Sequence, residues 1–155
     1  MKQKYKKGLA FGVFDIFHIG HLRYLQFASD RCKELYVGIR SDDLVTPGKN
    51  RKAYFNENIR LEVIQSLQCV KEAFVFRIIL DDTKYWINYL QENEINILFI
   101  GMDWKNSNRW QKLEPLLNDI NIKVFYVDRT ENISSSKILI KNKKKRHTKY
   151  TKIKN

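Results

Sequence analysis

The chain has 155 residues, which is the size of a single domain with one hydrophobic core. Hydrophobic residues make up 43% of it and aromatic residues 13%, a composition that excludes an intrinsically disordered chain. No apolar run is long enough to span a bilayer, and the two cysteines, Cys32 and Cys69, lack the spacing of a disulfide framework or a zinc site. We therefore expect a cytoplasmic protein with reduced thiols and no membrane insertion.

The formal net charge of +12 is concentrated near the C-terminal end. Residues 141–155 contain eight Lys or Arg residues and no acidic residue, so the rest of the chain carries only +4. A mildly basic body suits a phosphate-rich ligand and does not require nucleic acid. We expect one domain over residues 1–141 and a flexible basic tail over 142–155, because the tail has too few apolar residues to offset the entropy of ordering it. Contact of this tail with RNA or an anionic membrane stays open.

Apolar runs alternate with amphipathic stretches along the chain. In order, the pattern predicts a strand at 8–14, a helix at 22–32, a strand at 34–40, a polar loop around TPGKNRK (46–52), a helix at 56–67, a strand at 70–76, a helix at 83–93, a strand at 95–101, a helix at 109–120 despite Pro115, a strand at 122–127 and a last helix beginning at 134–141. This order predicts one α/β Rossmann-like domain, with a five-stranded parallel sheet and helices on both faces.

Ligands of such sheets bind beyond the carboxyl ends of the strands. Three loops at that edge carry unusual polar residues: 14–21, 101–105 and 128–136. The first contains His18 and His21, three residues apart at the expected start of a helix, where both rings fall on one face. Free backbone N–H groups at a helix start favour phosphate, and Gly20 removes a side chain where a ligand approaches. Packing or capping by two histidines that flank a glycine is the weaker interpretation.

The loop at 47–60 contains closely spaced cations, Lys49, Arg51 and Lys52, and Arg60 lies on the helix that follows. Such runs are usually ordinary surface charge, but a cationic loop can also close over phosphates. In the loop at 101–105, Asp103 can cap a turn or accept a hydrogen bond from a base, and Trp104 can pack in the core or stack on that base.

Together, the segments GVFDIFHIGH (12–21), GMDWK (101–105) and RTENISSSKI (129–138) resemble motifs of the cytidylyltransferases in the HxGH nucleotidyltransferase superfamily. The resemblance extends from about Gly8 to Ile140. Two positions depart from the family pattern: Met102 replaces the first aspartate of GDDW, and Asn132 replaces the glycine of RTEGIS. The second exchange is mild, because Asn tolerates a left-handed backbone better than most residues.

The resemblance implies transfer of CMP from CTP to a small phosphorylated acceptor, such as glycerol 3-phosphate, with release of pyrophosphate. It assigns catalytic roles to His18, His21, Lys49 and Arg129. It implies nucleotide contacts for Val13, Phe14, Gly20, Arg60, Gly101, Asp103, Trp104, Thr130, Ile133, Ser134 and Ser135. Asp15 and Lys84 are candidates for contacts near the acceptor, and Asp15 can instead orient the first loop or cap a turn. We expect Mg²⁺ to arrive with the nucleotide and no metal site in the protein.

The acceptor and the assembly stay open at this stage. Val13 resembles the GVFD of enzymes for phosphocholine and phosphoethanolamine, whereas the short chain resembles bacterial enzymes for glycerol 3-phosphate. Family members commonly form homodimers near the stretch that corresponds to 68–72, and we expect a dimer here. Two other functions compete: an adenylyltransferase acting on a sugar phosphate, and a non-catalytic module that binds nucleotides or RNA.

Overall fold

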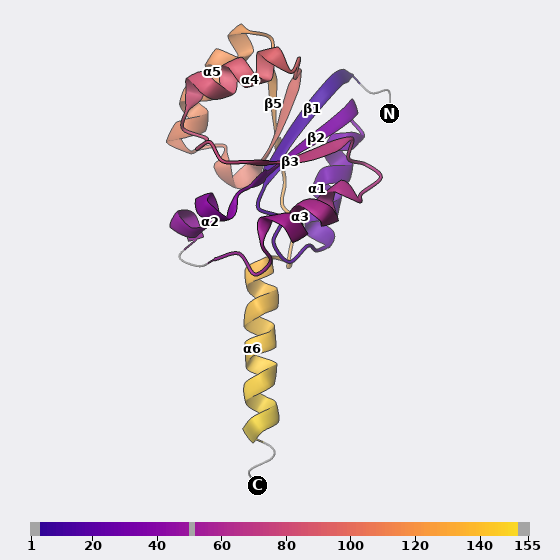
Figure 1. The fold of residues 1–155 in the computed structure, drawn as a ribbon, viewed down its shortest axis with the longest axis vertical. Helices are drawn as coiled ribbons and strands as arrows, with labels where there is room; N and C mark the ends of the chain where they lie inside the picture. Colours follow the sequence, from indigo (N-terminus) through magenta and orange to yellow (C-terminus); the bar gives the residue numbers. More distant parts are fainter. Residues whose placement is uncertain (1–3, 50–51, 152–155) are drawn as a thin grey trace.

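The computed structural model describes residues 4–49 and 52–151 and confirms a single α/β domain with a five-stranded parallel sheet (Figure 1). The strand order is β3-β2-β1-β4-β5. The strands are β1 (Tyr5–Gly12), β2 (Cys32–Arg40), β3 (Glu72–Phe76), β4 (Ile97–Gly101) and β5 (Lys123–Val127). The helices are α1 (Ile19–Ser29), α2 (Asp42–Lys49), α3 (Glu57–Gln65), α4 (Thr83–Glu92), α5 (Asn108–Asp119) and α6 (Ser135–Thr151), with a short 3₁₀ helix at Met102–Trp104.

Two hydrophobic clusters cover the two faces of the sheet. On one face, Leu25 and Ala28 of α1 and Ile64 of α3 pack against β1, β2 and β4. On the other face, residues of α4 and α5 pack against Leu9 and Leu98 of the central strands. Burial on both faces explains why the segment 97–100 is apolar at every position. Figure 1 shows α4 and α5 on one side of the sheet and α1 and α3 on the other.

The first strand and the loop at 46–52 differ from the sequence-based expectation. The first strand begins at Tyr5 and ends at Gly12. It cannot continue further, because Phe14 (φ 55°) and Ile16 (φ 49°) have left-handed backbone that a strand cannot contain. The polar loop predicted over TPGKNRK is wrong in its first half, since α2 extends through Lys49. Helix α2 is held at its start by Asp42, whose backbone N–H donates to Glu57 Oε2 at 2.8 Å while the Glu57 N–H donates to Asp42 Oδ2 at 3.1 Å.

The last helix extends into the stretch predicted as a basic tail. Helix α6 continues through Thr151, ten residues beyond the predicted boundary at 141, and extends away from the domain (Figure 1). Its basic residues lie toward its C-terminal end, where the helix dipole favours positive charge. None of the helices in the described ranges is both long and apolar enough to cross a bilayer. Cys32 and Cys69 are free thiols, the first buried and the second half-buried.

Candidate active site

The site lies where the strand order reverses, between β1 and β4. These strands are neighbours in the parallel sheet, with Ala10 opposite Phe99, so the loops that follow them emerge side by side at the carboxyl edge. Tyr24 of α1 connects the two strands further, because its hydroxyl donates to the Phe99 carbonyl at 2.7 Å. The adjacent β5 brings the loop at 128–134 and the start of α6 to the same edge.

The structure brings His18 and His21 together, as predicted from their spacing. Their rings stack with centroids 3.9 Å apart and an interplanar angle of 21°. His18 is the N-cap of α1, and its Nδ1 accepts a hydrogen bond from the Gly20 backbone N–H at 3.1 Å. An Nδ1 that accepts leaves the proton of the neutral ring on Nε2. His18 is therefore both a helix cap and a ring whose Nε2–H is available as a donor.

Burial disfavours the charged form of His18. Partial burial lowers the pKa of His18 below its ordinary value of 6.5, because it disfavours the charged imidazolium. His21 packs against the rings of Phe14 and Phe17, with centroids 5.5 Å and 5.6 Å away. Two positive charges on rings stacked this closely would also repel one another. The arrangement thus favours a neutral His18 ring near pH 7, with Nε2–H as its donor.

The structure shows a packing reason for the glycine at position 20. A Cβ atom at this position would lie 2.9 Å from Cε1 and 3.0 Å from Nδ1 of His18, and 3.4 Å from Cγ2 of Ile133. The glycine therefore makes room for the His18 ring and for Ile133, which approaches from the loop after β5. No local pattern predicts this contact, because the two segments are more than 100 positions apart.

The loop after β1 is held by hydrogen bonds to distant segments. Asp15 is 4% exposed, and its carboxylate accepts the backbone N–H groups of Tyr54 at 2.8 Å and Phe55 at 3.0 Å. The Asp15 carbonyl accepts from the Ser135 hydroxyl at 2.5 Å. Asp15, predicted as an acceptor contact, thus anchors the cationic segment before α3 and the start of α6 to the histidine loop. Left-handed backbone at Ile16, which is β-branched, persists because these contacts impose it.

Arg60 is not the open cation that the sequence suggested. Its side chain is 1% exposed, and it donates to three backbone carbonyls and one carboxylate: Phe55 O (3.0 Å), Val13 O (2.7 Å), Arg40 O (2.9 Å) and Asp42 Oδ1 (2.7 Å). Partial burial would raise the pKa of Asp42, but the hydrogen bonds from Arg60 and the Glu57 backbone outweigh it and lower that pKa. In this structure the expected contact with a nucleotide is replaced by an internal one that holds the ends of β1 and β2.

Asp103 and Arg129 form an ion pair across the loops after β4 and β5. Arg129 Nε lies 2.6 Å from Asp103 Oδ2, and the two side chains are 73% and 51% exposed. An exposed pair of this kind contributes little stability and opens readily. Trp104 stands beside them at the surface, 48% exposed, with the Arg109 guanidinium 5.9 Å from its ring. Gly101 ends β4 immediately before this loop.

The motif at 129–138 has the expected backbone at its exchanged position. Asn132 has φ 62°, the left-handed conformation that a glycine also adopts. Thr130, Ile133, Ser134 and Ser135 are half-buried around the start of α6. Ser134 caps this helix, because its hydroxyl accepts from the Lys137 N–H at 3.2 Å. The other two serines are not needed for that cap, although Ser135 contacts the Asp15 carbonyl.

Other residues predicted for the site make different contacts or lie outside the part of the chain that the structure describes. Val13 is half-buried and Phe14 is buried, and Val13 supplies only its carbonyl, to Arg60. Lys84 is exposed in the first turn of α4. Lys49 ends α2, but its side chain lies outside the described part, as does the whole of Arg51. Sequence reasoning missed Asp42; the Ser-Asp-Asp start of a helix was the available signal.

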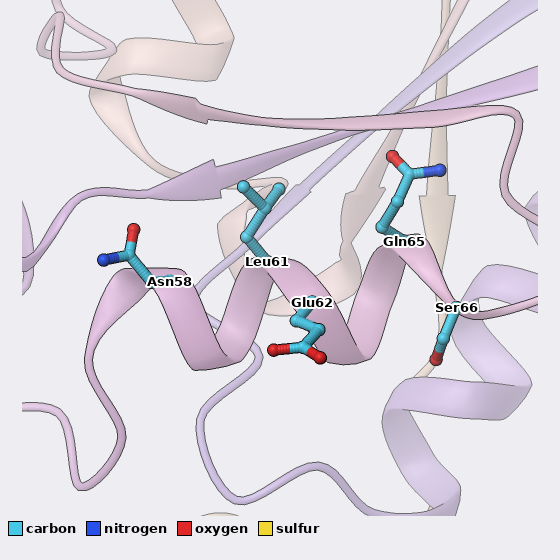
Figure 2. A pocket seen from close by; sticks show the side chains of 5 residues that line it. All are labelled: Asn58, Leu61, Glu62, Gln65 and Ser66. Carbon is cyan, nitrogen blue, oxygen red and sulfur yellow. The ribbon is translucent and has the colours of Figure 1, made fainter.

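A shallow depression elsewhere on the surface is not part of this site. Its lining residues all belong to α3 or directly follow it: Asn58, Leu61, Glu62, Gln65 and Ser66 (Figure 2). It contains no histidine, no cation and no residue predicted for catalysis or nucleotide binding. The residues predicted for the site therefore do not line this depression.

Comparison with known proteins finds similar sequences and a similar structure. The family model described as "Cytidylyltransferase-like" matches residues 9–141. A glycerol-3-phosphate cytidylyltransferase of Bacillus spizizenii is 28% identical over 86% of this chain and 94% of its own length. An FAD synthase of Thermococcus onnurineus is 30% identical over 84% of this chain and 87% of its own. The crystal structure of a lipopolysaccharide core biosynthesis protein from Thermoplasma volcanium superimposes with a TM-score of 0.63 at 26% identity, covering 83% of this chain and 98% of that one.

Proposed function

The chain belongs to the cytidylyltransferase-like family of nucleotidyl-transferring enzymes, and from this premise we propose that it transfers CMP from CTP to a small phosphate monoester such as glycerol 3-phosphate. The observation that carries the proposal is the stacked histidine pair at the point where the strand order reverses. One member of that pair caps a helix through Nδ1 and keeps Nε2–H for a ligand.

In the proposed reaction an oxygen of the acceptor phosphate attacks the α-phosphorus of CTP. A new P–O bond forms there, the bond from the α-phosphorus to the bridging oxygen breaks, and the electron pair leaves with pyrophosphate. No protein nucleophile is needed, so the residues act by positioning and by stabilising charge. His18 and His21 donate to the α-phosphate and the bridging oxygen as negative charge develops.

The remaining predicted residues receive roles around the histidine pair. The β- and γ-phosphates are bound by Arg129, Lys49 and the hydroxyls of Ser134 and Ser135. Asp103 accepts a hydrogen bond from the cytosine amino group, and Trp104 packs against the base. Arg129 and Asp103 exchange their ion pair for these contacts, which costs little at an exposed position. Mg²⁺ carried by the nucleotide would supply further neutralisation of the triphosphate.

A homodimer through α3 is part of the proposal. Ile59 and Val63 lie one turn apart on this helix and are 43% and 36% exposed, and Tyr54 and Phe55 just before it are 66% and 38% exposed. These apolar side chains lie next to the region where the dimer was expected from the sequence. Sedimentation of the wild type and of Val63→Asp tests this point: a dimer that the substitution does not weaken contradicts it.

An adenylyltransferase is the second candidate, favoured by the similarity to a protein named FAD synthase. Pyrophosphate release decides between the candidates when each nucleoside triphosphate is combined with glycerol 3-phosphate, phosphoethanolamine, a sugar phosphate or FMN. Release with CTP alone supports the proposed cytidylyltransferase. Release with ATP alone would establish an adenylyltransferase instead. No release with any combination, together with salt-sensitive RNA binding, would establish the non-catalytic module instead. We place the reaction in the cytoplasm, where CTP is available and thiols stay reduced.

A further inference from the structure

A second charged cluster lies at the carboxyl edge and consists of Arg40, Arg109 and Asp81. Its two arginines, Arg40 and Arg109, are here called the arginine pair. Arg40 ends β2, Arg109 lies in the first turn of α5, and Asp81 precedes α4. Arg109 Nε lies 2.5 Å from Asp81 Oδ1, and the Arg109 side chain is only 23% exposed. Three separate elements therefore direct charged groups to one place.

Arg40 reaches this cluster because of strand alternation. Val37 and Ile39 belong to the cluster on the α1 and α3 face, so Arg40 projects to the opposite face, toward α4 and α5. Its partner in the sheet register is Phe76, on the neighbouring strand β3. The rings of Phe76, Phe11 and Trp86 pack edge to face with one another next to this strand end.

The charges of the cluster do not balance. Burial lowers the pKa of Arg40, the nearby Arg109 lowers it further, and Asp81 acts in the opposite direction. Two guanidinium groups thus share one carboxylate, and that carboxylate is bound to Arg109. Across the described ranges, the half-buried Arg40 side chain has no hydrogen-bond or ion-pair partner, in contrast to Arg60 with its four hydrogen bonds.

The cluster adjoins the candidate active site. The Arg109 guanidinium lies 5.9 Å from the centre of the Trp104 ring, and Trp104 directly follows Asp103 in the loop after β4. Arg40 is on the strand next to β1, whose following loop carries the histidines. An anion held between Arg40 and Arg109 would therefore lie at the same edge as the triphosphate.

We propose that Arg40 and Arg109 bind the phosphate of the acceptor, and that the acceptor is a polyol or sugar phosphate without a cationic group. The inference rests on the proposed function. A dianionic acceptor approaching a bound triphosphate is repelled unless cations are placed on its own side, and paired guanidinium forks match a phosphate. The same surplus of positive charge disfavours phosphoethanolamine and phosphocholine, since an ammonium group would be repelled. A free oxygen of Asp81 can accept from a neutral hydroxyl.

Steady-state kinetics of Arg40→Gln and Arg109→Gln test the inference, with Lys123→Gln as a control that removes one exposed positive charge at the opposite end of the sheet. We expect each arginine variant to raise the KM for glycerol 3-phosphate by about tenfold or more, with the KM for CTP nearly unchanged, because charge-assisted hydrogen bonds are the strong ones. Arg40→Lys should recover part of the loss. Circular dichroism and equilibrium binding of CTP identify variants that fail to fold.

The outcomes separate the two proposals. If the wild type releases no pyrophosphate with any acceptor, the proposed function fails. If the wild type is active but the folded arginine variants keep the wild-type KM for the acceptor, only the arginine pair is wrong. A wild-type kcat/KM for phosphoethanolamine equal to that for glycerol 3-phosphate would also overturn the inference, whereas a strong preference for the polyol phosphate supports it.

Discussion

The guanidinium of Arg60 lies 2.7 Å from the carboxylate of Asp42, and the same guanidinium donates to the Val13 carbonyl at 2.7 Å. Through these contacts a residue of α3 joins the start of α2 to the end of β1. Because Arg60 is 1% exposed, water cannot replace the bonds that it makes.

Removing this guanidinium should unfold the protein more readily. For Arg60→Leu we expect a loss of about 3–5 kcal/mol in the free energy of unfolding, because three carbonyls and a carboxylate lose their donor. Urea denaturation followed by circular dichroism measures it. Arg77→Gln is the matched control, since Arg77 is an exposed arginine paired with Glu57, and its effect should be far smaller. Equal effects of the two substitutions would show that Arg60 is not the internal anchor described above.

Substitutions of His18 can separate capping from chemistry. Asn is a strong N-cap, so His18→Asn should retain the hydrogen bond from the Gly20 N–H and most of the stability, while losing Nε2–H. His18→Ala should lose both and be about 1 kcal/mol less stable than the asparagine variant. We expect turnover in both variants to fall by about 10²–10³, as when a single donor to a developing charge is removed. Rates of pyrophosphate release and thermal unfolding check this. An active His18→Asn would reduce His18 to a helix cap.

The pH dependence of the reaction should reflect the lowered pKa of His18. Since burial moves this pKa below 6.5, the ring stays neutral and Nδ1 stays an acceptor at pH values where an ordinary histidine is protonated. We expect kcat/KM to be constant above pH 6.5 and to fall only in more acidic solution. The unfolded chain takes up the proton first as the pH decreases through 6.5, so this histidine also lowers stability on the acid side. An acid limb above pH 6.5 would contradict the assignment.

A methyl group at position 20 should disturb the His18 ring more than the fold. In Gly20→Ala the new Cβ would lie 2.9 Å from His18 Cε1, so the ring must rotate or shift. We expect kcat to fall by about tenfold or more, given the sensitivity of positioned groups to displacements near 1 Å. Thermal stability should change little in comparison, because alanine favours the helix. Wild-type kcat in this variant would show that the ring position is not critical.

The ion pair between Arg129 and Asp103 should matter for the nucleotide and not for folding. Both side chains are more than half exposed, so Arg129→Gln should leave the midpoint of thermal unfolding nearly unchanged. We expect the KM for CTP to rise by about tenfold, because a charge-assisted hydrogen bond to phosphate is lost. Kinetics with varied CTP measure this rise. A lower melting temperature with an unchanged KM would assign the residue to the structure alone.

Local patterns were sufficient for most of the fold. Apolar runs at 34–40 and 95–101 predicted parallel strands, and helical spacing predicted α1, α3, α4 and α5, because these elements depend on which residues face the core. Helix α2 was missed because Pro47 and Gly48 are typical of loops, whereas its start is held by Glu57 and Arg60, which lie more than ten residues away. The left-handed backbone at Phe14 and Ile16 had no sequence signal, since neither residue favours it.

The sequence by itself determined the class of fold and the pairing of His18 with His21, and it predicts the carboxyl edge as the place of the site. Each follows from spacing along a helix or from the geometry of parallel strands. Only the tertiary structure decided which charged residues stay exposed at that edge and which are bonded inside the protein. Arg60 became an internal anchor, Asp15 a support for a neighbouring loop and Arg40 a half-buried cation without a described partner. The physical reason is that a charged side chain takes its role from burial and from partners distant in sequence, and neither is set by its neighbours along the chain.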